Sequence, residues 1–339
     1  MKVTVLMTLF NKASYVKEAV ESVLASDLAN FELLVVDDAS TDDGPDIVRS
    51  MGDPRIRLLS SDRNRGRAAS AERGFMAAQG EYIAVLDADD MMASDRLSAQ
   101  AEFLDLHPDV AVVGSSLQCF DGSHEFMRFP KGGPELRARS FFSVPVSYGA
   151  CMFRTRIVQQ LGVRAVSEWH LPGEDHLFLL ALGQYGEFAN LGMPLTRYRI
   201  GDQNMAYGRD RNSDRSALSK AILEWFGLVP DKAEMEAQML LYHFVPDRID
   251  PTDVRAAFRW KERLIADIPG RRGMPQEAFH AELARRWGRL FFVLADAHPR
   301  AAWEHWRLSR TSWAQLYYLA SAFLKARRSH FRNSGHDPV

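Results

Sequence analysis

The sequence has little cysteine and no long apolar run. Its 339 residues include only two cysteines, Cys119 and Cys151, which are too few for a disulfide framework and favour a reducing compartment. No apolar stretch reaches the roughly 18 uncharged residues that a transmembrane helix requires. The N-terminal residues, MKVTVL, are too short and too strand-like for a signal peptide. These absences predict a cytoplasmic protein.

The glycine-rich motifs that bind phosphate are also missing. No G-x-G-x-x-G follows the first predicted strand, where Thr8-Leu9-Phe10-Asn11 stands instead, and no G-x-x-x-x-G-K occurs. This argues against a dinucleotide-binding fold and against a nucleotidyltransferase with a glycine-rich loop after its first strand. The charge of a phosphorylated ligand would have to be met differently, for example by a metal ion held on carboxylates.

Charge is almost balanced over the whole chain but not along it. The net charge is −2, yet residues 255–339 carry 16 Lys and Arg against 7 Asp and Glu, which leaves −11 for residues 1–254. An acidic front and a basic tail predict different partners for the two parts. The hydrophobic content of 46% is ample for a packed core, and the length predicts two domains.

Strands and helices alternate through the first part of the chain. Apolar runs rich in β-branched residues predict strands, and apolar residues at helical spacing predict helices. The expected elements are strand 2–9, helix 15–24, strand 31–36, a short helix from Pro45, strand 55–59, helix 67–79, strand 82–86 and helix 95–107. This alternation predicts a parallel, doubly wound sheet.

The pattern changes further along the chain. We expect strands at 110–117, 147–153 and 195–200, helices at 155–161 and 175–185, and a loop-rich interval at 121–145. Strand signals end near residue 213, and the remaining segments are helical with breaks at prolines. The predicted organisation is therefore a domain of residues 1–210 and an all-helical region of residues 211–339.

Residues 82–90 are the stretch around which the chain is organised. This apolar run ends in three carboxylates, Asp87, Asp89 and Asp90. Two similar clusters, Thr8–Asn11 and Asp37–Asp38, follow other predicted strands, and parallel strands would bring all three to one edge of the sheet. Each cluster alone is explained by turn formation, but the three together predict a ligand site. Crowded carboxylates of this kind suit Mg²⁺ or Mn²⁺.

In this order and at these separations, the motifs resemble those of the family 2 glycosyltransferases. The resemblance runs from about Val3 to about Arg199 and rests on segments 5–11, 15–24, 34–42, 64–66, 80–90 and 173–175. It implies the GT-A fold, an α/β, Rossmann-like architecture with a mixed sheet and helices on both faces. The helical region after residue 210 lies outside the resemblance.

The resemblance also implies roles for single residues. The nucleotide-binding residues would be Thr8, Leu9, Phe10, Asn11, Asp38, Arg67, Asp87 and Ala88. Asp38 would accept a hydrogen bond from the base, as expected for uracil N3–H. Arg67, or Arg65 as the less favoured choice, would lie near the base or diphosphate. In the D-x-D motif, Asp89 would bind the divalent cation directly, Asp87 would reach the ribose or the water around the metal ion, and Asp90 would support the loop.

The candidate catalytic base lies in Leu171-Pro172-Gly173-Glu174-Asp175-His176. Carboxylates at the start of a helix are explained by capping alone, whereas the resemblance assigns Asp175 as the general base and Glu174 as a residue that orients the acceptor or the metal-site loop. His176 is a competing base. Trp169 and His170 would either stack on the acceptor or pack the loop.

Some positions depart from the family pattern. No His follows Tyr198-Arg199, so Asp202, Arg209 or Arg211 would have to complete the site. Ser94 stands where the family often has Pro, and Ala71-Glu72 stands where Arg-Asn is expected. The four carboxylates Asp38, Asp87, Asp89 and Asp175 are all present, which indicates subfamily variation.

Two aromatic-rich stripes occur in the helical region. They are Trp287, Leu290, Phe291, Val293 and Leu294, and Trp313, Leu316, Tyr317, Ala320, Phe323 and Leu324, with the basic run 325–328 after the second. Such helices either lie on an anionic membrane surface or pack on the catalytic domain. No nucleic-acid-binding motif accompanies the basic charge, so we expect no nucleic-acid partner.

These observations predict an inverting, metal-dependent glycosyltransferase that builds bacterial polysaccharide. The donor would be a nucleotide-sugar, with a UDP-sugar favoured, and the acceptor a hydroxyl of a saccharide or lipid-linked saccharide. The protein would be cytoplasmic, or peripheral on the inner face of the membrane. The alternative is a non-catalytic protein that binds nucleotide-sugar within a polysaccharide assembly complex.

Overall fold

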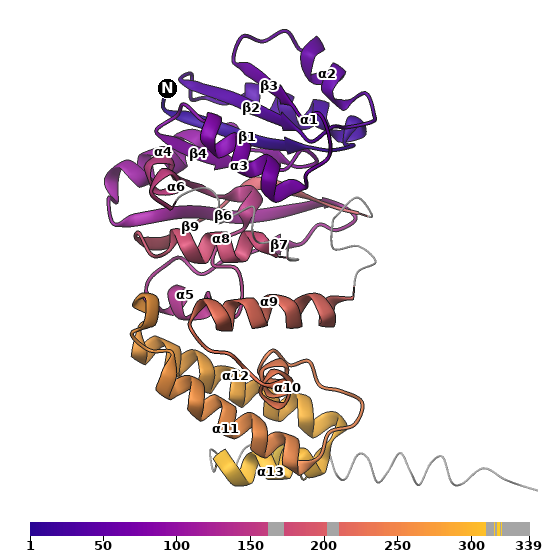
Figure 1. The fold of residues 1–339 in the computed structure, drawn as a ribbon, viewed down its shortest axis with the longest axis vertical. Helices are drawn as coiled ribbons and strands as arrows, with labels where there is room; N and C mark the ends of the chain where they lie inside the picture. Colours follow the sequence, from indigo (N-terminus) through magenta and orange to yellow (C-terminus); the bar gives the residue numbers. More distant parts are fainter. Residues whose placement is uncertain (162–172, 202–209, 310–314, 316, 319, 321–339) are drawn as a thin grey trace, which may run out of the picture. The chain divides into compact units, whose positions relative to one another are not determined.

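The computed structural model describes residues 1–161, 173–201 and 210–309, together with residues 315, 317, 318 and 320. The chain folds as two compact units, Met1–Asp214 and Arg215–Val339, and Figure 1 shows their elements. The N-terminal unit contains all the strands of the described residues.

The N-terminal unit begins with strands and helices that alternate. In chain order its elements are β1 (Val3–Leu9), α1 (Ala13–Leu24), β2 (Phe31–Asp37), α2 (Gly44–Ser50), β3 (Ile56–Ser60), α3 (Arg67–Ala77), β4 (Tyr82–Val85), β5 (Met91–Met92), α4 (Arg96–Leu106), β6 (Val110–Asp121), β7 (Phe126–Met127), α5 (Pro134–Arg139), η1 (Tyr148–Ala150), β8 (Met152–Arg154), α6 (Thr155–Leu161), α8 (Glu174–Leu182) and β9 (Glu187–Ile200).

One mixed sheet forms the frame of this unit. Among the described residues its strand order is β3-β2-β1-β4-β8-β6-β9-β5, and β7 pairs with β6 at the side. β3, β2, β1 and β4 are parallel, but β8 runs antiparallel to both β4 and β6. The predicted mixed sheet is confirmed, and the wholly parallel sheet is wrong. The strand–helix alternation that enforces parallel pairing ends after β6, and a long loop-rich connection leads into β8 instead.

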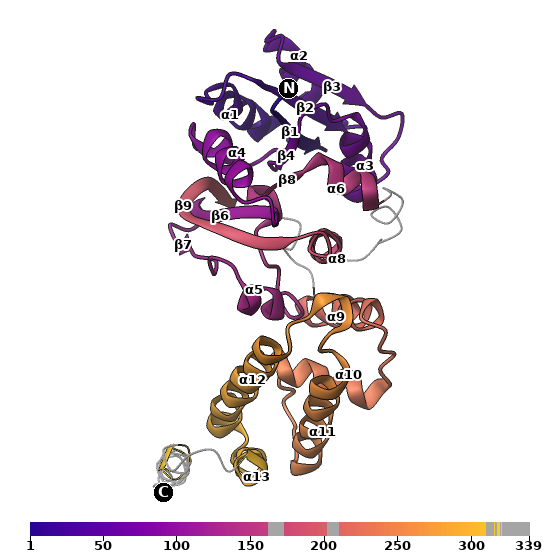
Figure 2. The ribbon, with the colours of Figure 1, turned by 90° about the vertical axis from the view of Figure 1, so that its left-hand side faces the viewer.

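Two separate apolar cores pack on the two faces of the sheet. One contains side chains of α1, α2 and α4, such as Val16, Val48 and Leu97. The other contains side chains of α3, α6 and α8, such as Phe75 and Phe178. Figure 2 shows α1 and α4 on one side of the sheet and α3, α6 and α8 on the other. The expectation of helices on both faces is therefore confirmed.

The least accurate predictions concern the middle of the chain. The strand predicted at 195–200 is longer than expected and begins at Glu187. Its first half is hard to predict because Gly192 and Pro194 interrupt the apolar pattern, and the pairing with β6 shifts register at the same place. The predicted strand 147–153 is a helical turn, η1, followed by the short β8. The interval 121–145 is rich in loop, as predicted, and also contains the short elements β7 and α5.

The C-terminal unit is helical, as predicted. Its elements are α9 (Arg211–Trp225), which starts in the N-terminal unit, α10 (Lys232–Leu241), α11 (Pro251–Asp267), η2 (Arg271–Gly273), α12 (Gln276–Ala297) and α13 (Pro299–Ser309). Asp231 and Asp250 open α10 and α11 with reciprocal capping bonds to Glu234 and Asp253. None of the described helices has the length and apolar content that crossing a bilayer requires.

The first aromatic stripe belongs to the core of the helical unit. Trp287, Leu290, Phe291 and Leu294 are each at most 5% exposed, whereas Val293 is 39% exposed. The buried part of this stripe therefore packs within the helical unit itself, which neither predicted alternative, a membrane surface or the catalytic domain, described. Most of the second stripe lies outside the described residues, and its Tyr317 is 80% exposed.

His305 gives the helical unit a predictable pH dependence. Its ring is fully buried, stacks on Trp287 with centroids 4.0 Å apart, and Nε2 lies 2.8 Å from the carbonyl oxygen of Trp287. Burial lowers the pKa of His305 from 6.5 to about 4. The unfolded chain therefore binds more protons between these values, and the stability contributed by neutral His305 is lost as the pH falls from about 6.5 to about 4.

We expect this loss to reach about 3 kcal/mol in the free energy of unfolding near pH 4. Urea unfolding followed by tryptophan fluorescence at pH 7 and pH 4 measures it, because His305→Gln should remove this part of the pH dependence. His280→Gln, at a half-buried His of α12, is the control. An equal pH dependence in wild type and His305→Gln would contradict the prediction.

Candidate functional site

The three polar clusters meet at one edge of the sheet, as predicted. Leu9 at the end of β1 pairs with Asp37 at the end of β2, and Leu6 of β1 pairs with Val85 of β4. The N–H of Leu86 continues this pairing by donating to the carbonyl of Leu6 at 3.1 Å. Residues that follow these strands therefore emerge side by side, which is the usual position of a ligand site in an α/β sheet.

The segment after β1 presents its residues in different ways. Phe10 is 42% exposed and Thr8 is half-buried, so both are available to a ligand. Leu9, however, is 1% exposed. It belongs to the core that contains side chains of α1, α2 and α4, which we call the α1-side core. Its predicted contact with the nucleoside cannot be made by its side chain, because the alternation of β1 turns that side chain inward.

Asn11 ties this segment to the one that follows β2. Its φ of 52° is in the left-handed region, which Asn tolerates better than most residues. Its side-chain oxygen accepts the backbone N–H of Thr41 at 2.8 Å, and its own N–H donates to Ser40 Oγ at 3.1 Å. In this structure Asn11 therefore braces the two loops, and its predicted contact with nucleotide stays a prediction.

Asp38 is a buried carboxylate that shapes the start of α3. Its two oxygens accept the backbone N–H groups of Arg65 at 2.9 Å and Gly66 at 2.8 Å. Gly66 has a φ of 88°, a conformation that favours glycine, and directly precedes the first residue of α3, Arg67. A base N3–H, as predicted, would have to use a remaining lone pair of Asp38.

The D-x-D motif forms a tight turn after β4, closed by the N–H of Asp90 donating to the carbonyl of Asp87 at 3.1 Å. Asp89 is 9% exposed, and its Oδ2 lies 2.6 Å from Nζ of Lys12. Ala88 is 3% exposed and packs in the α1-side core. Only the backbone of Ala88 is therefore able to contact nucleotide, which corrects the prediction for its side chain.

Two carboxylates of this turn, Asp87 and Asp90, have pKa values above the usual range. Burial raises the pKa of Asp87, Arg67 opposes this, and the charges of Asp89 and Asp175 add to it. Burial together with the charge of Asp87 raises the pKa of Asp90 to about 8. These carboxylates are close enough to interact, and they sit where added positive charge would stabilise their ionised forms.

Two arginines that the sequence did not single out hold the turn in place. Arg96 of α4 is fully buried and donates to the carbonyls of Val85, Gly149 and Cys151. Arg199 of β9 donates through Nε to the carbonyl of Asp89 at 2.8 Å, and through its backbone N–H to Oδ1 of Asp90 at 2.9 Å. Asp90 therefore supports the loop, as predicted.

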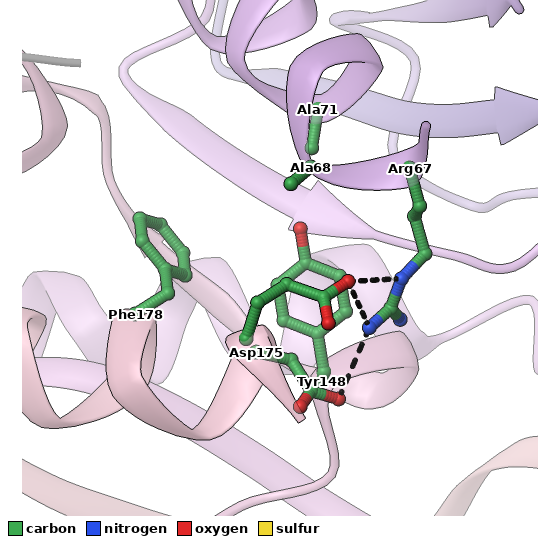
Figure 3. Close-up of a pocket in the computed structure, with 7 residues that line it drawn as sticks. Arg67, Ala68, Ala71, Tyr148, Asp175 and Phe178 are labelled. Atoms are coloured by element: carbon green, nitrogen blue, oxygen red, sulfur yellow. Dashed lines mark hydrogen bonds and ion pairs between the residues drawn. The ribbon is translucent and has the colours of Figure 1, made fainter. Parts of the chain in front are cut away.

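The predicted base lies across from this turn, at the start of α8. Arg67 donates to Oε1 of Glu174 from Nε at 3.0 Å and from Nη2 at 2.8 Å, and the same Nη2 is 3.6 Å from Oδ2 of Asp175. Figure 3 shows Arg67 of α3 reaching toward the carboxylate of Asp175, with the ring of Tyr148 beside them. These residues and Ala68, Ala71 and Phe178 line a pocket.

Arg67 links the two halves of the site electrostatically. Burial alone would lower the pKa of Arg67, but the charges of Asp175, Glu174 and Asp87 outweigh burial and raise it. Its guanidinium also lies 5.4 Å from the ring centroid of Tyr148, whose pKa burial raises, so that the phenol stays protonated. Nothing in the sequence singles out Tyr148, which lies in the segment 147–153 that predicts a strand.

His176 does not point into this pocket. It is 1% exposed, and its Nε2 lies 2.6 Å from the carbonyl oxygen of Ser140. The competing prediction of His176 as the base is therefore wrong in this structure, because neither the exposure nor the direction of the ring suits proton transfer to a substrate. Asp175 keeps 25% of its side chain exposed.

Several further predictions fall outside the part of the chain that the structure describes. They concern Trp169, His170, Asp202 and Arg209. Arg211 is described, and it is exposed at the first position of α9. Arg65 donates from Nη2 to Oδ1 of Asp62 at 2.9 Å on an exposed surface, and so Arg67 is the arginine that the structure brings to the carboxylates.

Gly149 allows a close approach that leads to a sharp prediction. A Cβ at this position would lie 2.7 Å from Oδ2 of Asp87, which is closer than real contacts allow. We expect Gly149→Ala to displace the carboxylate of Asp87 and weaken UDP binding about tenfold, a loss of about 1.4 kcal/mol. Isothermal titration calorimetry measures this binding. Gly192→Ala, where a Cβ would meet nothing within 4 Å, is the control, and equal affinity of the two variants would contradict the prediction.

Comparisons with known proteins agree with this geometry. The sequence model described as Glycosyl transferase family 2 matches residues 4–162. The putative glycosyltransferase EpsE of Bacillus subtilis is 32% identical over 231 residues, which cover 66% of this chain and 80% of EpsE. The UDP-Glc:alpha-D-GlcNAc-diphosphoundecaprenol beta-1,3-glucosyltransferase WfaP of Escherichia coli is 27% identical over 58% of this chain and 77% of WfaP. Three further curated relatives, among them the succinoglycan biosynthesis protein ExoO of Rhizobium meliloti, are matched over less than half of their own length.

A solved structure shows the same fold. S. aureus TarS 1-349 in complex with UDP-GlcNAc superimposes with a TM-score of 0.58 at 17% identity, over 90% of this chain and 89% of that chain. Three findings lead to one conclusion. They are the edge of three parallel strands that bears the D-x-D turn, the facing helix that begins with two carboxylates, and the relative matched over most of its length. The chain belongs to glycosyl transferase family 2 and has the GT-A fold.

Proposed function

We propose that this chain transfers a sugar from a UDP-sugar to a hydroxyl of a saccharide or lipid-linked saccharide, with inversion and with the help of a divalent cation. The observation that carries the proposal is the position of Arg67 between the D-x-D turn and the start of α8. The charges of Asp87 and Asp175 both raise the pKa of Arg67, so the two predicted halves of the chemistry lie within electrostatic reach of one guanidinium.

The choice of donor and acceptor is supported by the relatives. WfaP is described as using UDP-Glc and a diphosphoundecaprenol-linked sugar, and TarS was crystallised with UDP-GlcNAc. For the whole protein, the proposal is that it takes part in polysaccharide synthesis at the inner face of a membrane.

The residues of the D-x-D turn suit a magnesium or manganese ion that takes most of its ligands from elsewhere. No group of three or more His, Cys, Asp or Glu that could hold a metal ion occurs among the described residues. Mg²⁺ is commonly held by one or two carboxylates together with substrate phosphates and water. Asp89 would hold the ion, with Asp87 nearby, and the ion would stabilise negative charge on the leaving diphosphate.

The chain's own residues would do the rest. Asp175 would accept the proton of the attacking hydroxyl, and Glu174 would hold Arg67 and orient the acceptor. Phe10 and Thr8 would contact the nucleoside. Inversion requires one in-line displacement, and a carboxylate on α8, facing the turn that binds the leaving group, is suitably placed to assist it.

A panel of nucleotide-sugars tests the proposal directly. The protein is incubated with each donor and a saccharide acceptor, with and without Mn²⁺, and the released nucleoside diphosphate is measured. We expect turnover of a UDP-sugar that depends on the metal ion. No turnover of any donor, together with nucleotide-sugar binding that Asp89→Ala leaves unchanged, would favour the non-catalytic scaffold instead.

The helical unit would bring the enzyme to an anionic membrane surface. Trp303 of α13 and Phe292 of α12 are 48% and 44% exposed, and residues 255–339 carry the excess of positive charge. Exposed aromatic side chains and basic residues together favour interfacial binding.

We expect deletion of residues 311–339 to weaken binding to vesicles that contain anionic lipid by about tenfold. The deletion removes three net positive charges, each of which contributes about 1 kcal/mol of attraction to an anionic surface before screening by salt. Co-sedimentation with anionic and with neutral vesicles measures the effect. Equal binding of the full chain and the truncated chain to anionic vesicles would contradict this prediction.

A further inference from the structure

Lys12 brings a positive charge to the carboxylate that is predicted to hold the metal ion. It is the last residue before α1, and its carbonyl accepts the N–H groups of Tyr15 and Val16, both at 2.9 Å. These bonds fix the backbone of Lys12 at the start of the helix. The side chain then crosses from the end of β1 to the turn after the neighbouring β4, where Nζ lies 2.6 Å from Oδ2 of Asp89.

This ion pair is more sheltered than an ordinary surface pair. The side chains of Lys12 and Asp89 are 21% and 12% exposed. In the surface pair Lys17–Glu21 of α1 the side chains are 66% and 54% exposed, and Nζ lies 3.9 Å from Oε1. Charge–charge interactions strengthen as water is excluded. The charge of Lys12 also opposes the rise in the pKa of Asp87, so it acts on both outer carboxylates of the D-x-D motif.

An ammonium group and a divalent cation that approach the same carboxylate repel each other, so Lys12 and a metal ion would compete for Asp89. A lysine on a flexible stem is, however, able to move a short way to another anion, and a diphosphate bound at this edge of the sheet would be such an anion. The backbone of Asp89 would not have to move, because its carbonyl is held by Nε of Arg199 at 2.8 Å.

We propose that Lys12 is the resident cation of the diphosphate site. It holds Asp89 in the donor-free protein and turns to a phosphate of the nucleoside diphosphate when a divalent cation takes the carboxylate. This inference rests on the proposed function. It predicts that the metal ion alone binds weakly because it must displace Lys12, and that nucleotide and metal ion each strengthen the binding of the other.

The test is the affinity for Mn²⁺, measured by electron paramagnetic resonance with and without saturating UDP. In the wild type we expect UDP to tighten Mn²⁺ binding by at least about tenfold. Lys12→Met should bind Mn²⁺ about tenfold more tightly than wild type in the absence of UDP, because the competing cation is gone, and should show a smaller effect of UDP. Lys12→Met should also bind UDP more weakly in metal-free buffer.

Two variants keep the result interpretable. Lys17→Met makes the same change of charge at the exposed position on α1 and should match the wild type. Lys12→Arg retains a cation and should keep weak Mn²⁺ binding without UDP, which also controls for folding. The proposal would be overturned if, without UDP, Lys12→Met bound Mn²⁺ no more tightly than the wild type. Absence of Mn²⁺ binding in both the wild type and Lys12→Met counts as that result. If UDP fails to bind the wild type, the donor prediction fails, while the arm with Mn²⁺ alone still decides whether Lys12 competes for Asp89.

Discussion

Asp175→Asn should lower the rate of sugar transfer by about 10³-fold while UDP binding stays unchanged. General-base catalysis typically contributes about 10²- to 10⁴-fold, and the amide of Asn cannot take the proton of an acceptor hydroxyl. Asn is close to Asp in size, and Arg67 would keep its two bonds to Glu174, so the pocket should retain its shape. The affinity for UDP should not change, because Asp175 is not among the residues expected to bind UDP.

The measurement is the transfer rate at saturating donor, together with calorimetry of UDP binding. Asp95→Asn is the matched control, since Asp95 is exposed and lies just before α4, where its side chain makes no capping bond. Transfer within about tenfold of the wild type would remove Asp175 from the role of base. His176 would not inherit that role, because its ring is buried against Ser140.

Asp89→Asn should produce the second large effect, a loss of about 10²- to 10³-fold in metal-dependent transfer. A cation at a leaving group supplies several kcal/mol of stabilisation to the charge that develops there, and about 1.4 kcal/mol corresponds to a factor of ten in rate. The amide keeps the size of the side chain but loses the charge that attracts the ion. The Arg199 bond to the carbonyl of Asp89 does not depend on the side chain, so the turn should persist.

This prediction is checked by titrating Mn²⁺ against the rate of UDP release. The concentration of Mn²⁺ needed for half-maximal rate should rise in Asp89→Asn and stay unchanged in Asp95→Asn. An unaltered dependence on Mn²⁺ in Asp89→Asn would show that the ion binds elsewhere or that the reaction does without it. Circular dichroism separates either result from a loss of folding.

The strands that carry the donor side were predictable because they are buried on both faces. β1, β2 and β4 read as short apolar runs, and each begins and ends within about two residues of the predicted position, inside the usual uncertainty of element boundaries. Turn-forming Asp and Asn residues mark their ends. Parallel pairing then fixes which residues become neighbours, so the cluster at the edge of the sheet followed from sequence order alone.

What could not be predicted is what depends on contacts between distant segments. Nothing in the local pattern shows that Lys12 reaches Asp89, which is 77 positions away, or that Arg67 reaches Glu174, 107 positions away. The family resemblance assigns Leu9 and Ala88 to the nucleotide by their positions in the motifs, although strand alternation turns the side chain of Leu9 into the core. The prediction of His176 as a competing base is wrong because α8 is buried nearly all round. The sequence of such a helix does not show which side chains face a pocket.

The packing of the sheet on its two faces has an evolutionary consequence. The residues around the D-x-D turn, including Leu86 and Met92, belong to the core shared with α1 and α4, whereas α8 packs in the core on the opposite face. Under the proposed function, a substitution that reshapes the acceptor side at α8 leaves the packing of Leu86 and Met92 beside the D-x-D turn unchanged, although α8 shares its own core with α3. Under the proposed function, the acceptor side is therefore freer to vary in evolution than the apolar core that supports the D-x-D turn.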